Sequence, residues 1–78
     1  MNDDFLREFS EIIEMSVLEI HDDLNLQNTT EWDSIACLST ITLVDRYYKV
    51  SLSNDDFKSI RLFKELKSVI NSKVESQQ

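Results

Sequence analysis

The chain passes from a polar loop into an amphipathic helix at Glu31-Trp32-Asp33-Ser34-Ile35-Ala36-Cys37-Leu38, and this stretch decides the interpretation of the fold. Asp33 and Ser34 are both favoured at the first position of a helix. A serine held there is exposed, and a phosphate attached to it would lie at the positive end of the helix dipole. The alternative is that Asp33-Ser34 only caps the helix, which is the commoner role of such a pair.

Length and composition restrict the chain to one small domain. Its 78 residues can build only a thin core, which can barely enclose an active site. A single cysteine permits no internal disulfide and fits a reducing compartment. The absence of Gly and Pro argues against a sheet with tight turns. No apolar run is long enough to span a membrane, and the acidic start is unlike a signal peptide. We therefore expect a cytoplasmic, all-α protein without membrane insertion.

The charge is negative and unevenly distributed. A net charge of −7 argues against nucleic acid as a partner, because phosphate backbones need a basic face. Residues 1–45 hold eleven acids and one base, or −10, whereas residues 46–78 hold four acids and seven bases, or +3. An acidic half around Ser34 would attract a basic partner surface, although such charge can also serve solubility alone.

Apolar spacings of three and four residues predict a small four-helix bundle. The expected helices are 3–19, 34–48, a short third helix over 54–60 and a last helix over 62–73. A long loop over 21–33 joins the first two, and Leu24 and Leu26 are expected to pin it to the core. Ser53 and Asp56 form a predicted capping box. The ordered core should cover about residues 3–73, and the polar tail 75–78 should be disordered.

The helical periodicity also assigns the two faces of the helices. The residues expected to face the core are Phe5, Phe9, Ile12, Ile13, Val17, Ile20, Ile35, Leu38, Ile41, Val44, Tyr48, Phe57, Ile60, Leu62, Phe63, Leu66, Val69 and Ile70. On the second helix, the residues expected to face water are Ala36, Ser39, Asp45 and Arg46.

Few side chains are candidates for chemistry. His21 is the only histidine and has no cysteine at metal-ligand spacing, so we interpret it as a solvated loop residue and expect no metal site. Cys37 lies one helical turn after Ser34, where it either lines a pocket or is a small half-buried residue, and the second interpretation is favoured. Trp32 either packs across the loop or contacts partners, and packing is favoured. We expect no catalytic residue.

The order of these elements resembles an acyl carrier protein over about residues 3–73. Asp33-Ser34-Ile35 is similar to the attachment motif of that family, Asp-Ser-Leu/Ile. The remaining matches are apolar positions that the family keeps in and between its helices, namely Leu38, Ile41, Tyr48, Leu52, Ile60, Phe63, Leu66 and Ile70.

The resemblance implies that Ser34 carries a phosphopantetheine arm, with Asp33 and Ile35 completing the attachment motif. A phosphopantetheinyl transferase would attach the arm from coenzyme A, and the thiol of the arm would hold acyl groups as thioesters. The carrier is then a substrate of the transferase and not an enzyme. Acyl-loading and acyl-processing enzymes are its implied partners, and they would bind the face around Ser34 and the second helix.

Three departures from the family pattern affect the expected partners. The first is that the usual glycine near the motif is absent and Trp32 precedes Asp33. Another is that Arg61-Leu62 stands where the last helix usually has Ser or Thr. The second helix is poor in acids, with Asp45 as its one acid after Asp33 and Arg46 directly behind it. Such a helix favours a specialised biosynthetic pathway over bulk fatty-acid synthesis. The alternative function is an unmodified helical adaptor that binds a partner through the second helix.

Overall fold

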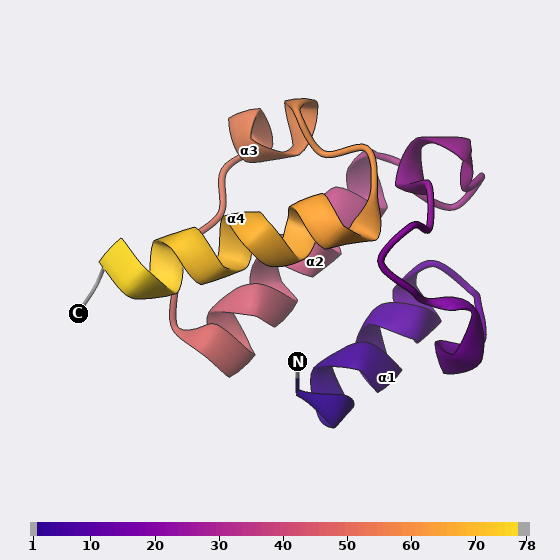
Figure 1. Ribbon diagram of the computed structural model, residues 1–78, viewed down its shortest axis with the longest axis horizontal. Coiled ribbons are helices and arrows are strands. Elements are labelled where there is room, and N and C mark those ends of the chain that lie inside the picture. The colour runs from indigo at the N-terminus through magenta and orange to yellow at the C-terminus, as the bar shows by residue number, and fades with distance from the viewer. Residues whose placement is uncertain (1, 77–78) are drawn as a thin grey trace.

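The computed structural model describes residues 2–76, and this part of the chain is all-helical. Its four α-helices are α1 (Asp3–Ile12), α2 (Ser34–Tyr48), α3 (Asn54–Lys58) and α4 (Phe63–Ser76), shown in Figure 1. Two single 3₁₀ turns, Val17–Glu19 and Leu26–Asn28, lie in the long connection between α1 and α2. The prediction of a four-helix bundle with a long first loop and a short third helix is confirmed.

Helix α1 begins as expected but ends early. The Asn2 side chain caps it by accepting hydrogen bonds from the N–H groups of Asp4 and Phe5, at 2.7 and 3.1 Å. The predicted end near residue 19 is wrong because Glu14 adopts a left-handed conformation with φ of 53°. The Glu14 and Met15 N–H groups then bond back to the carbonyls of Glu11 and Ser10, which is a Schellman ending without glycine.

A new turn begins directly after α1. The Ser16 hydroxyl accepts a hydrogen bond from the Leu18 N–H at 3.2 Å, and the Glu19 carboxylate accepts one from the Ser16 N–H at 3.3 Å. These local hydrogen bonds replace the backbone hydrogen bonds of the longer helix that the periodicity predicts. Val17 consequently faces solvent rather than the core, and Leu18 is 94% exposed.

The loop before α2 is pinned to the start of α4 by backbone pairing. The Leu26 N–H donates to the Arg61 carbonyl at 2.8 Å, and the Phe63 N–H donates to the Leu24 carbonyl at 2.9 Å. Leu26 is fully buried and Leu24 is half-buried, as expected. The loop is therefore anchored by both hydrogen bonds and apolar contacts, which holds its downstream end, at Trp32, in place.

Helix α2 has the predicted limits but a different inward face. Ile35 and Leu38 are 73% and 56% exposed, so their assignment to the core is wrong. The small side chains of Ala36 and Thr40 are buried instead, and the Thr40 hydroxyl is satisfied by donating to the Ala36 carbonyl at 2.8 Å. Small residues let α2 approach the core closely, which turns the larger side chains of the first turn outward. Of the residues expected to face water, only Ala36 is misassigned, because Ser39, Asp45 and Arg46 are exposed.

The last two helices differ from the prediction at their ends. The Asp56 carboxylate accepts from the Ser53 N–H at 2.8 Å, as the predicted capping box requires. Helix α3 stops at Lys58 rather than Ile60, because the chain then extends to pair with the loop. Helix α4 begins where the Glu65 carboxylate accepts from the Leu62 N–H at 3.0 Å. It continues through Ser76 while Val74 packs on the core, so the expected tail disorder is wrong for residues 75–76, and 77–78 lie outside the described residues.

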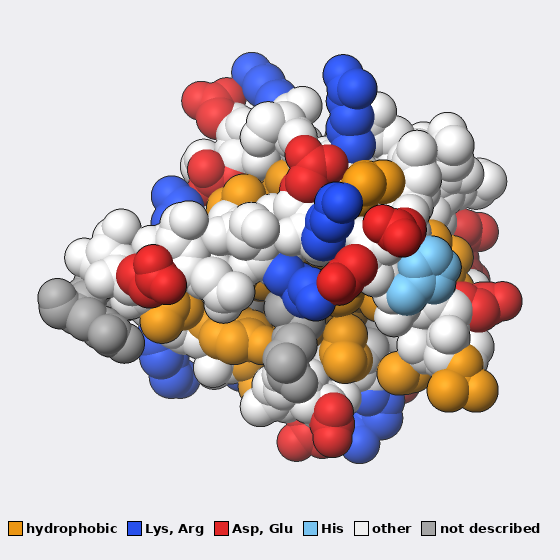
Figure 2. Space-filling model, viewed as in Figure 1, with side chains coloured by type: hydrophobic (Ala, Val, Ile, Leu, Met, Phe, Trp, Pro, Cys, Tyr) orange, Lys and Arg blue, Asp and Glu red, His pale blue; other side chains and the backbone are white. Residues whose placement is uncertain are grey.

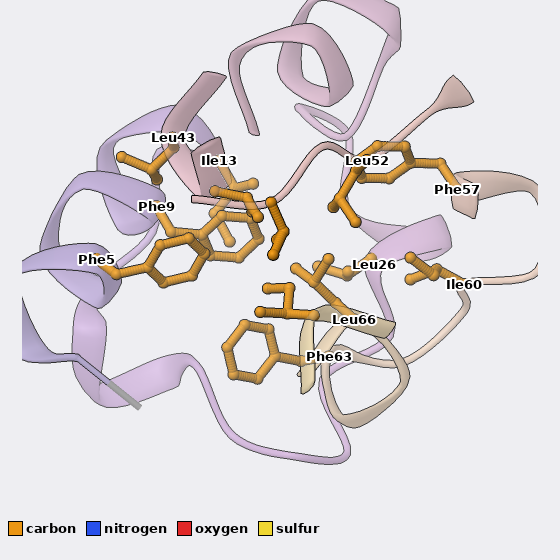
Figure 3. Close-up of a cluster of buried hydrophobic side chains, with 13 residues drawn as sticks. Phe5, Phe9, Ile13, Leu26, Leu43, Leu52, Phe57, Ile60, Phe63 and Leu66 are labelled. Carbon is orange, nitrogen blue, oxygen red and sulfur yellow. The ribbon is translucent and has the colours of Figure 1, made fainter. Parts of the chain in front are cut away.

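One apolar cluster joins all four helices and the loop. Phe5 and Phe9 of α1 stack with ring centroids 6.0 Å apart, and Phe63 of α4 packs on Phe9 in a tilted arrangement at 5.5 Å. Figure 3 shows Phe57 and Ile60 on the side of the cluster away from Phe5. The buried members are Phe5, Phe9, Ile13, Leu26, Leu43, Val44, Val50, Leu52, Phe57, Ile60, Phe63, Leu66 and Ile70.

The early end of α1 leads to a prediction about Glu14. A side chain with a Cβ atom is strained in the left-handed conformation, so Glu14→Gly is expected to raise the free energy of unfolding by up to about 1 kcal/mol. Glu11→Gly, three residues earlier inside α1, serves as the control and is expected to lower it by about 1 kcal/mol. Urea denaturation of both variants measures the difference. Equal destabilisation by the two glycines would contradict the assigned helix end.

Candidate functional site

Ser34 occupies the first position of α2, and Asp33 holds it there. The Asp33 carboxylate accepts a hydrogen bond from the Ala36 N–H at 2.8 Å, and the Asp33 carbonyl accepts one from the Cys37 N–H at 3.0 Å. Asp33 is therefore the helix cap, and the Ser34 side chain is exposed beside it in the first turn. A hydroxyl in this position is accessible to a second protein without any unfolding of the helix.

Trp32 ties this helix start to the core. Its ring centroid lies 5.9 Å from that of Phe9 on α1 and 5.7 Å from that of Phe57 on α3, in tilted or edge-on arrangements. Such aromatic pairs add attraction beyond the area they bury. The expectation that Trp32 packs across the loop is confirmed.

An open groove of about 530 Å³ lies between the start of α2 and α3. Ser34 is on its edge, so a group attached to the hydroxyl has direct access to the groove. Its lining combines apolar side chains with amides and one ammonium, and consists of Gln27, Trp32, Asp33, Ser34, Cys37, Leu38, Asn54, Phe57, Lys58 and Ile60. No sequence motif connects Gln27, Asn54 or Lys58 with Ser34, and only tertiary packing brings them together.

Cys37 lines this groove as a half-buried thiol, and it also packs against the core. Burial raises the pKa of the Cys37 thiol, and the negative charge of Asp33 raises it further. The thiol is therefore protonated at neutral pH and a poor nucleophile. Of the two nucleophilic side chains in the first turn of α2, Ser34 is the exposed one and Cys37 is kept inert.

A second, smaller groove of about 200 Å³ lies on the other side of the α2 start. Glu14, Glu31 and Asp33 line it together with the exposed side chain of Ile35. Ser34 thus lies between an acidic, apolar surface on one side and the larger groove on the other. Ile35 and Leu38 are exposed on either side of Ser34, so the two residues wrongly assigned to the core form an apolar surface patch beside the hydroxyl.

The exposed cation of α2 is engaged within the chain. Arg46 donates to the Glu8 carboxylate at 2.8 Å, and the Tyr47 hydroxyl donates to the same carboxylate. These contacts hold the pKa of Glu8 below its ordinary value of 4.5. The hydrogen bond from Tyr47 is the largest cause, and Arg46 lowers the pKa further. Arg46 therefore joins α2 to α1 as well as facing water, and its charge is partly neutralised before any partner approaches.

Charged side chains of both signs are scattered over the face formed by α4 and the long loop, as Figure 2 shows. Lys67 pairs with Asp22, and Lys64 lies 3.9 Å from Asp23. His21 is exposed on this surface, in agreement with its interpretation as a solvated residue. Within residues 2–76, His, Cys, Asp and Glu side chains form no cluster of three that could hold a metal ion. In the same part of the chain, every helix is too short or too polar to cross a membrane.

Protein-family models, curated proteins and solved structures were each compared with the chain, and none of them matches it. The resemblance to acyl carrier proteins therefore rests on the attachment motif and the order of the helices.

The Glu8 contacts lead to a prediction about pH. Because the pKa of Glu8 is lower in the folded state, the ionised carboxylate stabilises the folded chain at neutral pH. In acid the unfolded chain binds more protons, so this stabilisation is lost as the pH falls through the folded-state pKa. Glu8→Gln is therefore expected to lower the melting temperature at pH 7, with a difference from the unaltered chain that shrinks below about pH 4.5. Glu11→Gln, on the exposed side of α1, is the control and should show little difference at either pH. A Glu8→Gln difference that stays constant with pH would contradict the assignment.

Proposed function

We propose that the chain is an acyl carrier protein whose Ser34 bears a phosphopantetheine arm. The observation that carries the proposal is the exposed Ser34 hydroxyl, held in the first turn of a 15-residue helix at the edge of a groove. The Asp33-Ser34-Ile35 motif, the helix order and the acidic first half support it. The compartment that fits this role is the cytoplasm, where coenzyme A and reduced thiols are present.

The residues around Ser34 suit the attachment chemistry. The Ser34 oxygen attacks the phosphorus of coenzyme A that bears the pantetheine, and a transferase base takes the hydroxyl proton. An Oγ–P bond forms as the P–O bond of the pyrophosphate breaks, and adenosine 3′,5′-bisphosphate leaves. The resulting phosphodiester would be anionic, and Ser34 would hold it at the start of α2, where the helix dipole favours negative charge. When bound, the arm supplies a thiol that holds acyl groups as thioesters.

The surface around Ser34 suits transient partners. Exposed Ile35 and Leu38 offer apolar contacts on either side of the hydroxyl, and the acidic groove with Glu14 and Glu31 favours basic partner surfaces. Helix α2 itself offers Asp45 as its one acid, and Arg46 is already paired with Glu8. We infer that the partners are a phosphopantetheinyl transferase and the acyl-loading and acyl-processing enzymes of a specialised pathway. The chain itself holds the cargo and leaves catalysis to them.

Incubation with coenzyme A, magnesium and a promiscuous transferase tests the proposal. The intact mass is expected to increase by one phosphopantetheinyl group, and Ser34→Ala is expected to abolish the increase without loss of helical circular dichroism. Ser39→Ala, an exposed serine further along α2, is the matched control and should be modified at the normal rate. Modification at another serine, or none at all, would contradict the carrier function and favour the unmodified adaptor.

A further inference from the structure

The floor of the groove beside Ser34 is closed by core side chains. Phe57 and Ile60 line the groove, yet they are 8% and 1% exposed because their remaining surface packs against the core. The Trp32 ring packs against both Phe57 and Phe9. A long alkyl chain could pass from Ser34 into the bundle only by displacing these rings, and well-packed interiors resist such rearrangement.

The rim of the groove, in contrast, is polar. Gln27 and Asn54 place amide groups at the groove, and Lys58 adds an ammonium. Asp33 also lines the groove, but its carboxylate already accepts the Ala36 N–H as the cap of α2. Lys58 lies 3.0 Å from Asp55, but both side chains are largely exposed, so this ion pair is weak and Lys58 can exchange it for another anion. The Gln27 amide nitrogen donates to the Ile60 carbonyl at 3.4 Å, so this hydrogen bond does not use the amide oxygen, which can accept from a ligand. The rim therefore has both donors and acceptors.

We propose, resting on the proposed function, that the groove seats a short acyl group with a polar end and that Trp32 excludes long alkyl chains from the bundle. Leu38 and Phe57 contact the first carbons of the group, while Gln27, Asn54 and Lys58 meet its terminal hydroxyl or carboxylate. The carried group is then a hydroxyacyl or dicarboxylic acyl unit rather than a long saturated chain.

The test loads Ser34 from succinyl-, 3-hydroxybutyryl-, butyryl- or octanoyl-coenzyme A with a promiscuous transferase. Backbone amide NMR signals and the melting temperature are compared with those of the protein that carries the unacylated arm. Succinyl and hydroxybutyryl groups are expected to shift the signals of Gln27, Asn54 and Lys58 more than butyryl does. Octanoyl is expected to leave the melting temperature unchanged. Loading of none of the four groups onto Ser34 would overturn the proposed function and this inference together.

Two pairs of variants separate the roles of Trp32 and Lys58. Trp32→Ala is expected to let octanoyl raise the melting temperature by about 4 °C or more, whereas Trp32→Phe keeps an aromatic ring and should not. Lys58→Gln should remove most of the shift caused by succinyl, whereas Lys64→Gln, on α4, should not.

Two results would overturn the proposal while leaving Ser34 as the attachment site. The first is a rise in melting temperature when octanoyl is loaded on the unaltered chain, accompanied by shifts of core residues such as Val44. The second is an equal effect of butyryl and succinyl on the groove signals. Both measurements use the unaltered chain, so they decide the question even if Trp32→Ala fails to fold.

Discussion

The contact of Trp32 with Phe9 and Phe57 is the interaction on which the rest of the structure depends. It joins α1, the long loop and α3 at one point, directly before α2 begins. Asp33 follows at once and caps α2 through the Ala36 N–H. The core therefore determines where the helix starts, and the next residue, Ser34, is left exposed in a fixed place.

This constraint links stability to the proposed function. Because Trp32 fills the space beneath the start of α2, the surface beside Ser34 is an open groove with a closed floor. The small buried residues Ala36 and Thr40 bring α2 close to the core and turn Ile35 and Leu38 outward. The same packing that stabilises the bundle thus leaves the apolar side chains of Ile35 and Leu38 exposed beside Ser34, and it would limit what the proposed carrier could shelter.

The sequence was sufficient for the features that local chemistry determines. The Asp33 cap and the Ser53–Asp56 capping box marked two helix starts correctly. The end of α1 was not predicted because Glu14 adopts the left-handed conformation, which is usually occupied by glycine and is therefore usually visible in the sequence. The face of α2 was misassigned because periodicity cannot distinguish apolar residues that form a core from those that form a surface. The groove was not foreseen because Gln27 and Lys58 meet Ser34 only through tertiary packing.

The most direct test of the central claim is the intact mass of the protein purified from the cells that produce it, followed by fragmentation of the peptide around Ser34. The account predicts one phosphopantetheinyl group on Ser34, with or without a thioester-bound acyl group at its end. A protein that is unmodified in those cells, in the presence of an active transferase, would contradict it.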